Sequence, residues 1–128
     1  MADSFAGRPR GGTRGRDAPI DQSAVATALA HAFSPRVERE ARRVLDTAAD
    51  LTRLKIVRAL METPLAASDL ARVVARSPAA TSQHIRVLRE LGAVTATRSG
   101  NVIRYRMSRE PSAEVLEAIA RSFDLIAK

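Results

Sequence analysis

The stretch Ser77–Val94, SPAATSQHIRVLRELGAV, carries the strongest folding signals in this chain. Ser77 followed by Pro78 is typical of a helix start, because a serine hydroxyl caps the first free amides and proline suits the first helical position. Gly92 is typical of a helix end, since glycine readily adopts the left-handed conformation that closes a helix. The stretch therefore predicts a helix of residues 77–91 with well-defined ends.

Past Gly92 the hydrophobic period changes from that of a helix to that of a strand. Apolar and polar residues alternate along two short runs, with Val94 and Ala96 in the first and Ile103, Tyr105 and Met107 in the second. Between the runs lies the turn-forming triplet Ser99-Gly100-Asn101. This pattern predicts a two-stranded β-hairpin, which must pack on helices because an isolated hairpin is marginal in water.

Apolar residues at helical spacing predict further helices before the quoted stretch. An Ala-rich helix of residues 22–33 is followed by Ser34-Pro35, a second cap-and-proline pair that opens the next helix. A third helix starts near Asp50, and a short helix starts at Ala67 or Ser68. The residues expected to face inward on these two helices are Leu51, Leu54, Val57, Leu60, Leu70, Val73 and Val74.

A final helix completes the predicted fold. Ser112 is its expected cap, and its apolar residues follow at helical spacing. Two short helices, a capped third helix and a basic hairpin form a winged helix-turn-helix, so the predicted class is mainly α with a small β-hairpin wing. We expect one domain over residues 21–128, with residues 1–20 as a disordered basic arm rich in Gly, Arg and Pro.

The charge of the chain points to a polyanionic partner. The 128 residues include 21 Lys and Arg against 14 Asp and Glu, a net charge of +7. Residues 49–110 hold most of it, with eleven basic and five acidic residues. Nucleic acid is the first candidate for such a basic region. Aromatic residues make up only 3% of the chain, which disfavours stacking platforms for single strands.

The helix of residues 77–91 separates into two faces at 100° per residue. Thr81, Ile85 and Leu88 form the face expected to pack inward. The opposite face is small and polar, as a helix in the DNA major groove requires, and consists of Ala79, Ser82, Gln83, Arg86 and Glu90.

Three residues of this helix have specific expected roles in DNA binding. Gln83 can pair with adenine and Arg86 with guanine, and Ser77 with the helix N-terminus suits a phosphate. The alternative reading is an ordinary solvent-exposed helix face. His84 lies at the margin of the inward face, where a packed, hydrogen-bonded histidine is expected rather than a base contact.

The hairpin carries three arginines. Arg98 lies at its tip, and Arg104 and Arg106 lie on its outer face. Guanidinium groups there can contact the DNA backbone or enter the minor groove, and we expect this chiefly of Arg98 and Arg104. The alternative is a strand edge that is protected from aggregation by its charge.

Four stretches resemble motifs of the ArsR/SmtB-type winged-helix repressors. ADLTRLKIVRAL is similar to the family's ADPTRLxILxxL signature, and LAASDLARVV stands where the family has its LxVxELA helix. SPAATSQHIRVLRELGAV resembles its recognition helix, and RSGNVIRYRM resembles its wing. Together they span about residues 44–107. Ser82 matches the serine of the family's motif, whereas Pro78 and Ala79 stand where many members have Gln and Ser.

The resemblance implies a homodimer that binds an inverted repeat and represses until an inducer relieves it. The first and last helices would form the interface, which agrees with two apolar stripes that so small a monomer would struggle to bury. The expected interface residues are Val37, Ala41, Val44, Leu116, Ile119, Phe123 and Ile126.

The sensors common in the family have no counterpart here. The Cys-x-Cys positions of many members are Ala66 and Ser68, and the chain has no cysteine at all. The last helix offers Glu114 and Glu117 without a histidine, which makes a poor transition-metal site. We therefore expect no metal and no cofactor, and either an unidentified small-molecule effector or none.

The sequence favours a sequence-specific transcriptional regulator in the cytoplasm, associated with the nucleoid and double-stranded DNA. The main alternative is an architectural, nucleoid-type protein with little sequence preference. A winged helix used for protein contacts is disfavoured by the charge of residues 49–110. An enzyme is disfavoured because no cysteine, phosphate loop or paired acid and base is present. No signal peptide or membrane span is expected.

Overall fold

The computed structural model describes residues 20–127 and divides the chain into two units, Met1–Pro35 and Arg36–Lys128. The predicted disordered arm of residues 1–20 lies outside the described residues, except for the exposed Ile20.

In the first unit, α1 (Gln22–Leu29) begins where the Asp21 carboxylate accepts a hydrogen bond from the Ala24 N–H at 2.9 Å. This helix ends four residues earlier than the predicted end at Phe33.

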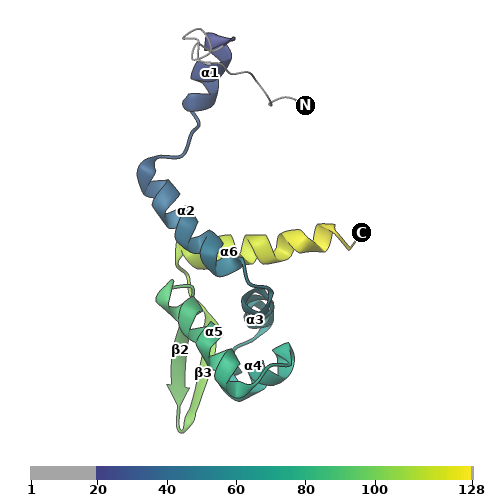
Figure 1. Cartoon of the computed structure of the whole chain (residues 1–128). Coiled ribbons are helices and arrows are strands. Elements are labelled where there is room, and N and C mark those ends of the chain that lie inside the picture. Colours follow the sequence, from purple (N-terminus) through teal and green to yellow (C-terminus); the bar gives the residue numbers. More distant parts are fainter. Residues whose placement is uncertain (1–19, 128) are drawn as a thin grey trace. The chain divides into compact units, whose positions relative to one another are not determined.

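The second unit contains the helices of the predicted reading domain (Figure 1). They are α2 (Pro35–Ala48), α3 (Leu51–Glu62), α4 (Ala67–Val74), α5 (Pro78–Glu90) and α6 (Pro111–Ser122), followed by the 3-10 turn η2 (Phe123–Leu125). The predicted start of α2 at Pro35 is confirmed. Asp50 caps α3 by accepting from the Arg53 N–H at 3.1 Å, which confirms the start near Asp50.

The wing is a three-stranded antiparallel sheet rather than a lone hairpin. β2 (Val94–Ser99) and β3 (Val102–Met107) form the predicted hairpin around Gly100, which has a positive φ of 64°. β1 (Leu65–Ala66) pairs with the other side of β3, opposite Tyr105 and Arg104. The predicted hairpin is thus confirmed, and β1 is an additional strand that was not predicted, because two residues are too few to show an alternating pattern.

The core lies around α3, which packs against α4, α5, α6 and β3. Its largest fully buried side chains come from each of these helices and are Ile56, Val57, Leu70, Thr81, Leu88 and Leu116. The side of α5 that faces this core is thereby fixed. Figure 1 shows α5 beside the β2–β3 hairpin, whose tip extends past the helices.

Two residues predicted to face inward are exposed. Val73 is 58% exposed because the buried arc of α4 is centred on Leu70, Ala71 and Val74. Leu51, at the first position of α3, is 67% exposed.

The start of α6 also differs from the prediction. α6 begins at Pro111, with Glu110 in the cap position, so Ser112 is not the cap. Instead, the Ser112 hydroxyl donates to the Leu91 carbonyl at 3.3 Å. This contact holds the first turn of α6 against the end of α5.

Candidate nucleic-acid interface

The solvent face of α5 is the one that the helical wheel predicted. Thr81, Ile85 and Leu88 are buried, which confirms the inward face. The opposite side is open to solvent and presents Ala79, Ser82, Gln83, Arg86 and Glu90. A helix with this division can approach the edges of base pairs without unpacking from its domain.

The beginning of α5 is held by its cap. The Ser77 hydroxyl oxygen accepts from the Ala80 N–H at 3.1 Å, and Thr81 Oγ1 donates to the Ser77 carbonyl at 2.9 Å. The predicted helix start at Ser77-Pro78 is therefore confirmed. The cap uses the Ser77 hydroxyl as an acceptor, so its own hydrogen can still be donated to a phosphate oxygen.

Gln83 and Arg86 lie one turn apart on the exposed face and contact each other. Arg86 Nη2 donates a hydrogen bond to Gln83 Oε1. The two groups thus present an amide and a guanidinium side by side, which are the side chains that pair in a bidentate manner with adenine and guanine. Because the two side chains are adjacent, they can contact two neighbouring base pairs.

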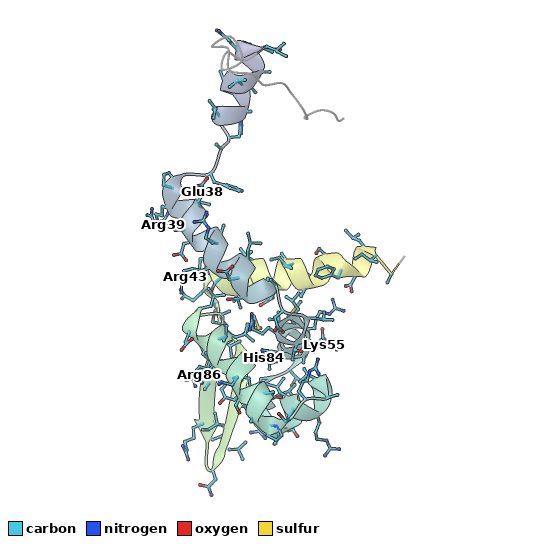
Figure 2. The ribbon with its side chains drawn as sticks, viewed as in Figure 1. Glu38, Arg39, Arg43, Lys55, His84 and Arg86 are labelled. Carbon is cyan, nitrogen blue, oxygen red and sulfur yellow. The ribbon has the colours of Figure 1, made fainter. Side chains whose placement is uncertain are left out.

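His84 lies on the other side of α5, toward α3 (Figure 2). Its side chain is 22% exposed, and Nδ1 lies 4.0 Å from Asp50 Oδ1. The histidine is thus packed at the margin of the inward face, as predicted. Its ring lies beside the Asp50 carboxylate, at a distance too long for the hydrogen bond that was also expected. Burial by itself would raise the pKa of the Asp50 carboxyl, but the Arg53 N–H and the charges of His84 and Arg53 together lower that pKa.

The three wing arginines are distributed over both faces of the sheet. Arg104 pairs with Thr97 and Arg106 with Thr95, which puts both arginines on one face. Arg98 pairs with Ile103 on the other face, and its Nε donates to the Gly100 carbonyl at 3.1 Å across the turn. The wing therefore offers a guanidinium group to a duplex from either side of its tip.

Arg89 joins the recognition helix to the wing and was not among the predicted site residues. Its guanidinium carbon lies 5.7 Å from the centre of the Tyr105 ring, a cation–π contact between α5 and β3. Ala96 pairs with Tyr105, so this face of the sheet is the one directed at α5. In the sequence, the position of Arg89 three residues after Arg86 is the feature that places it close to the exposed face of the helix.

The positions that correspond to the Cys-x-Cys pair of the resembled family have no metal-binding side chain in this chain. Ala66 lies in β1 and Ser68 in α4, and Glu117 pairs with Arg121 at 3.7 Å. Residues 20–127 contain no group of three His, Asp or Glu side chains that could hold a metal ion. Over the same residues, no helix combines the length and the hydrophobicity that a membrane span requires.

The residues predicted for a dimer interface separate into two groups. Leu116 is fully buried and Val44 is 7% exposed within the single chain, so both side chains pack in the core and leave little surface for a partner. Ala41 and Ile119 are partly exposed, whereas Val37, Phe123 and Ile126 are exposed.

Together, the exposed reading face of α5 and the basic wing define a winged helix-turn-helix DNA-binding regulator. The model of the arsR family of bacterial regulatory proteins matches residues 50–96. The HTH-type transcriptional regulator NmtR of Mycobacterium tuberculosis is 33% identical over 115 residues, which cover 87% of this chain and 85% of that protein.

Solved structures that resemble the fold include BigR and the Mb0332 domain. The transcriptional repressor BigR from Xylella fastidiosa gives a TM-score of 0.65 at 27% identity, over 73% of this chain and 92% of BigR. The homodimeric winged helix-turn-helix DNA-binding domain of Mb0332 from Mycobacterium bovis gives 0.59 at 22% identity, over 76% and 89%. This chain belongs to the ArsR family, and it is a DNA-binding transcriptional regulator and not an enzyme.

Proposed function

We propose that this regulator is a homodimeric repressor that reads an inverted-repeat operator in double-stranded DNA. The observation that carries the proposal is the exposed pair Gln83 and Arg86, held on one turn of α5 by their mutual hydrogen bond. Ala79 and Ser82 allow a close approach of the helix to the bases. Ser77, Arg98 and Arg104 would bind flanking phosphates and fix the register.

Dimerisation is supported by exposed apolar side chains at the C-terminal end of the second unit. Phe123 and Ile126 are 50% and 76% exposed and follow α6, and Val37 is exposed on α2. Apolar groups that protrude from so small a domain favour burial against a second copy. The homodimeric state of the Mb0332 domain and the repressor function of BigR point the same way.

The operator should consist of two half-sites related by two-fold symmetry. In a helix-turn-helix dimer the two reading helices enter successive major grooves, so half-sites lie about 10 base pairs apart or a multiple of that. Pro78 and Ala79 lack the polar groups that many family members carry there, so the operator differs from theirs. We infer no cysteine-based metal or redox sensor, since the chain contains no cysteine.

Genomic footprinting of the bound sites, followed by titration of the recovered operator against random DNA, tests this function. A repressor should prefer its operator by roughly 10³-fold or more at physiological salt. Binding of similar strength to all DNA, with a uniform loss as salt rises, would identify an architectural protein instead. Adding zinc or arsenite should leave operator affinity unchanged.

A further inference from the structure

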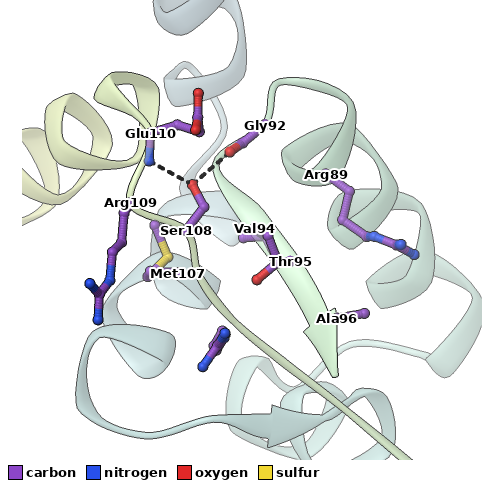
Figure 3. A pocket seen from close by; sticks show the side chains of 10 residues that line it. Arg89, Gly92, Val94, Thr95, Ala96, Met107, Ser108, Arg109 and Glu110 are labelled. Atoms are coloured by element: carbon purple, nitrogen blue, oxygen red, sulfur yellow. Dashed lines mark hydrogen bonds between the residues drawn. The ribbon is translucent and has the colours of Figure 1, made fainter. Parts of the chain in front are cut away.

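An open hollow of about 830 Å³ lies where the end of α5, the start of β2 and the segment leading into α6 come together (Figure 3). It has no place in the reading of bases by the exposed face of α5. Three arginines from three different elements line it, namely Arg89 of α5, Arg106 of β3 and Arg109 of the β3–α6 connection. Thr95 and Ser108 add hydroxyl groups, and Glu110 is its only acidic residue.

The frame of this hollow is tied together by hydrogen bonds. The Ser108 hydroxyl donates to the Gly92 carbonyl at 2.6 Å and accepts from the Glu110 N–H at 3.2 Å. The Ser108 N–H also donates to the Ala93 carbonyl at 2.8 Å. These contacts, two of them drawn in Figure 3, fix the β3–α6 connection against the turn after α5. The backbone that carries the arginines is therefore set before any ligand arrives.

The charges around the hollow are not neutralised within the described part of the chain. Over residues 20–127, neither Arg106 nor Arg109 has a carboxylate partner, although Arg43, Arg58 and Arg121 do. Arg89 lies against the Tyr105 ring, on the face of the sheet opposite to Arg106, so it borders the hollow without pointing toward the other two arginines. The two guanidinium groups of Arg106 and Arg109 against the single carboxylate of Glu110 leave an excess of one positive charge.

We propose that this hollow binds a phosphate group. Guanidinium groups match the geometry of phosphate oxygens and hold them with paired hydrogen bonds. No aromatic side chain lines the hollow, so it offers no stacking surface for a base or an apolar ligand. The phosphate can come from the backbone of a duplex that continues past the wing, or from a phosphorylated small molecule. Only the first source rests on the operator binding proposed above.

The test begins with the full-length protein without DNA, titrated with pyrophosphate at constant ionic strength and followed by amide NMR. Shifts should be confined to the hollow, including the amides of Thr95 and Ser108. Arg106→Gln and Arg109→Gln should each weaken pyrophosphate binding about tenfold, because each removes charge-assisted hydrogen bonds. Both side chains are exposed, so the fold should survive.

Two further variants sharpen this titration. Glu110→Gln should strengthen pyrophosphate binding, and its side chain makes no capping hydrogen bond that the fold would lose. Arg121→Gln removes one exposed positive charge outside the hollow and should change nothing. The proposal is overturned if pyrophosphate produces no shifts at the hollow, or if Arg106→Gln and Arg109→Gln bind it as the wild type does.

The second arm identifies the source of the phosphate. The salt dependence of operator binding is compared between the wild type and the Arg106→Gln/Arg109→Gln double variant. A slope that falls by about one to two units assigns the hollow to the DNA backbone. An unchanged slope, together with pyrophosphate binding, assigns it to a small phosphorylated molecule. If the protein selects no operator, the proposed repressor function fails while the pyrophosphate titration still decides this site.

Discussion

The Oδ1 atom of Asp50, which caps α3, lies 4.0 Å from Nδ1 of His84 on the recognition helix α5. Arg53 extends this contact to a third helix, because its Nε donates to the Thr47 carbonyl at 2.8 Å and its Nη2 to the Asp46 carbonyl at 3.1 Å. The end of α2, the start of α3 and the middle of α5 are thereby connected through three side chains. This group therefore links α5, which presents Gln83 and Arg86, to the adjoining ends of α2 and α3.

Replacing Asp50 tests the contact. Asp50→Ala should destabilise the fold by about 1–2 kcal/mol, because the cap of α3 is lost. Asp50→Ser should recover most of that loss, since a serine hydroxyl caps a helix as well but carries no charge for His84. Urea unfolding measures both. Equal stability of Asp50→Ala and the wild type would show that the capping carboxylate contributes nothing.

Acid should weaken the contribution of Asp50. The pKa of this carboxyl is lowered from 3.8, so the folded state holds it ionised at acidities where the unfolded chain binds a proton. Its stabilising effect is therefore complete above the unfolded value and is lost as the pH falls through the lower, folded pKa. The stability difference between the wild type and Asp50→Ser should shrink as the pH decreases from about 5 to 3. Urea unfolding across this range checks the prediction, which a constant difference would contradict.

Gln83 and Arg86 should determine sequence preference, whereas Arg104 should contribute affinity alone. Gln83→Ala or Arg86→Ala should cost about 1–3 kcal/mol on the operator and relax the preference at one base step. Arg104→Ala should weaken operator and random DNA alike and lower the salt slope by about one unit. Titrations on both DNAs separate the two behaviours. Equal losses on random DNA for Gln83→Ala and Arg86→Ala would remove them from direct base reading.

The elements predicted correctly are those with local signals at both ends. Ser77, Pro78 and Gly92 mark α5 by backbone chemistry that acts within a few residues, and the period of two marks the hairpin. β1 could not be foreseen, because Leu65 and Ala66 become a strand only by pairing with β3. The same holds for the hollow, whose arginines come from α5, β3 and the connection to α6.

The side chains that were misplaced show why a helical stripe does not define its own partner. Leu116 and Phe123 follow the same apolar pattern, but α3 covers Leu116 and leaves Phe123 half exposed. Val73 and Val74 are identical in chemistry, and only the direction from which the core approaches α4 decides which is buried. Tertiary packing supplies that direction.

Ala75, in the turn between α4 and α5, has a left-handed φ of 55°. This conformation costs a residue with a side chain about 1–2 kcal/mol, whereas glycine adopts it freely. Ala75→Gly should therefore stabilise the fold by up to about 1 kcal/mol, after the added entropy of the unfolded chain is subtracted. Thermal unfolding should show a rise of a few degrees, and an unchanged or lower midpoint would contradict the strain.

Gly100 provides the reverse control at the tip of the wing. It has a φ of +64°, and an added Cβ would meet no atom within 4 Å. Gly100→Ala should thus destabilise through backbone conformation alone, by about 1 kcal/mol. Opposite signs for Ala75→Gly and Gly100→Ala would establish that backbone conformation, and not packing, sets both effects.

The exposed apolar residues after α6 should hold the proposed dimer together. Phe123→Asp or Ile126→Asp should produce a monomer that keeps its helical content, because both side chains are exposed in the single chain. Each buried copy of such a side chain stabilises an interface by about 1.5–3 kcal/mol, and a two-fold dimer contains two copies. The dissociation constant should therefore rise by about 100-fold or more. Sedimentation at micromolar concentrations measures it.

Leu116→Asp is the contrasting variant, since a charge at this fully buried position should unfold the chain instead. A wild type that sediments only as a monomer would exclude the dimer, and dimeric Phe123→Asp and Ile126→Asp variants would move the interface elsewhere.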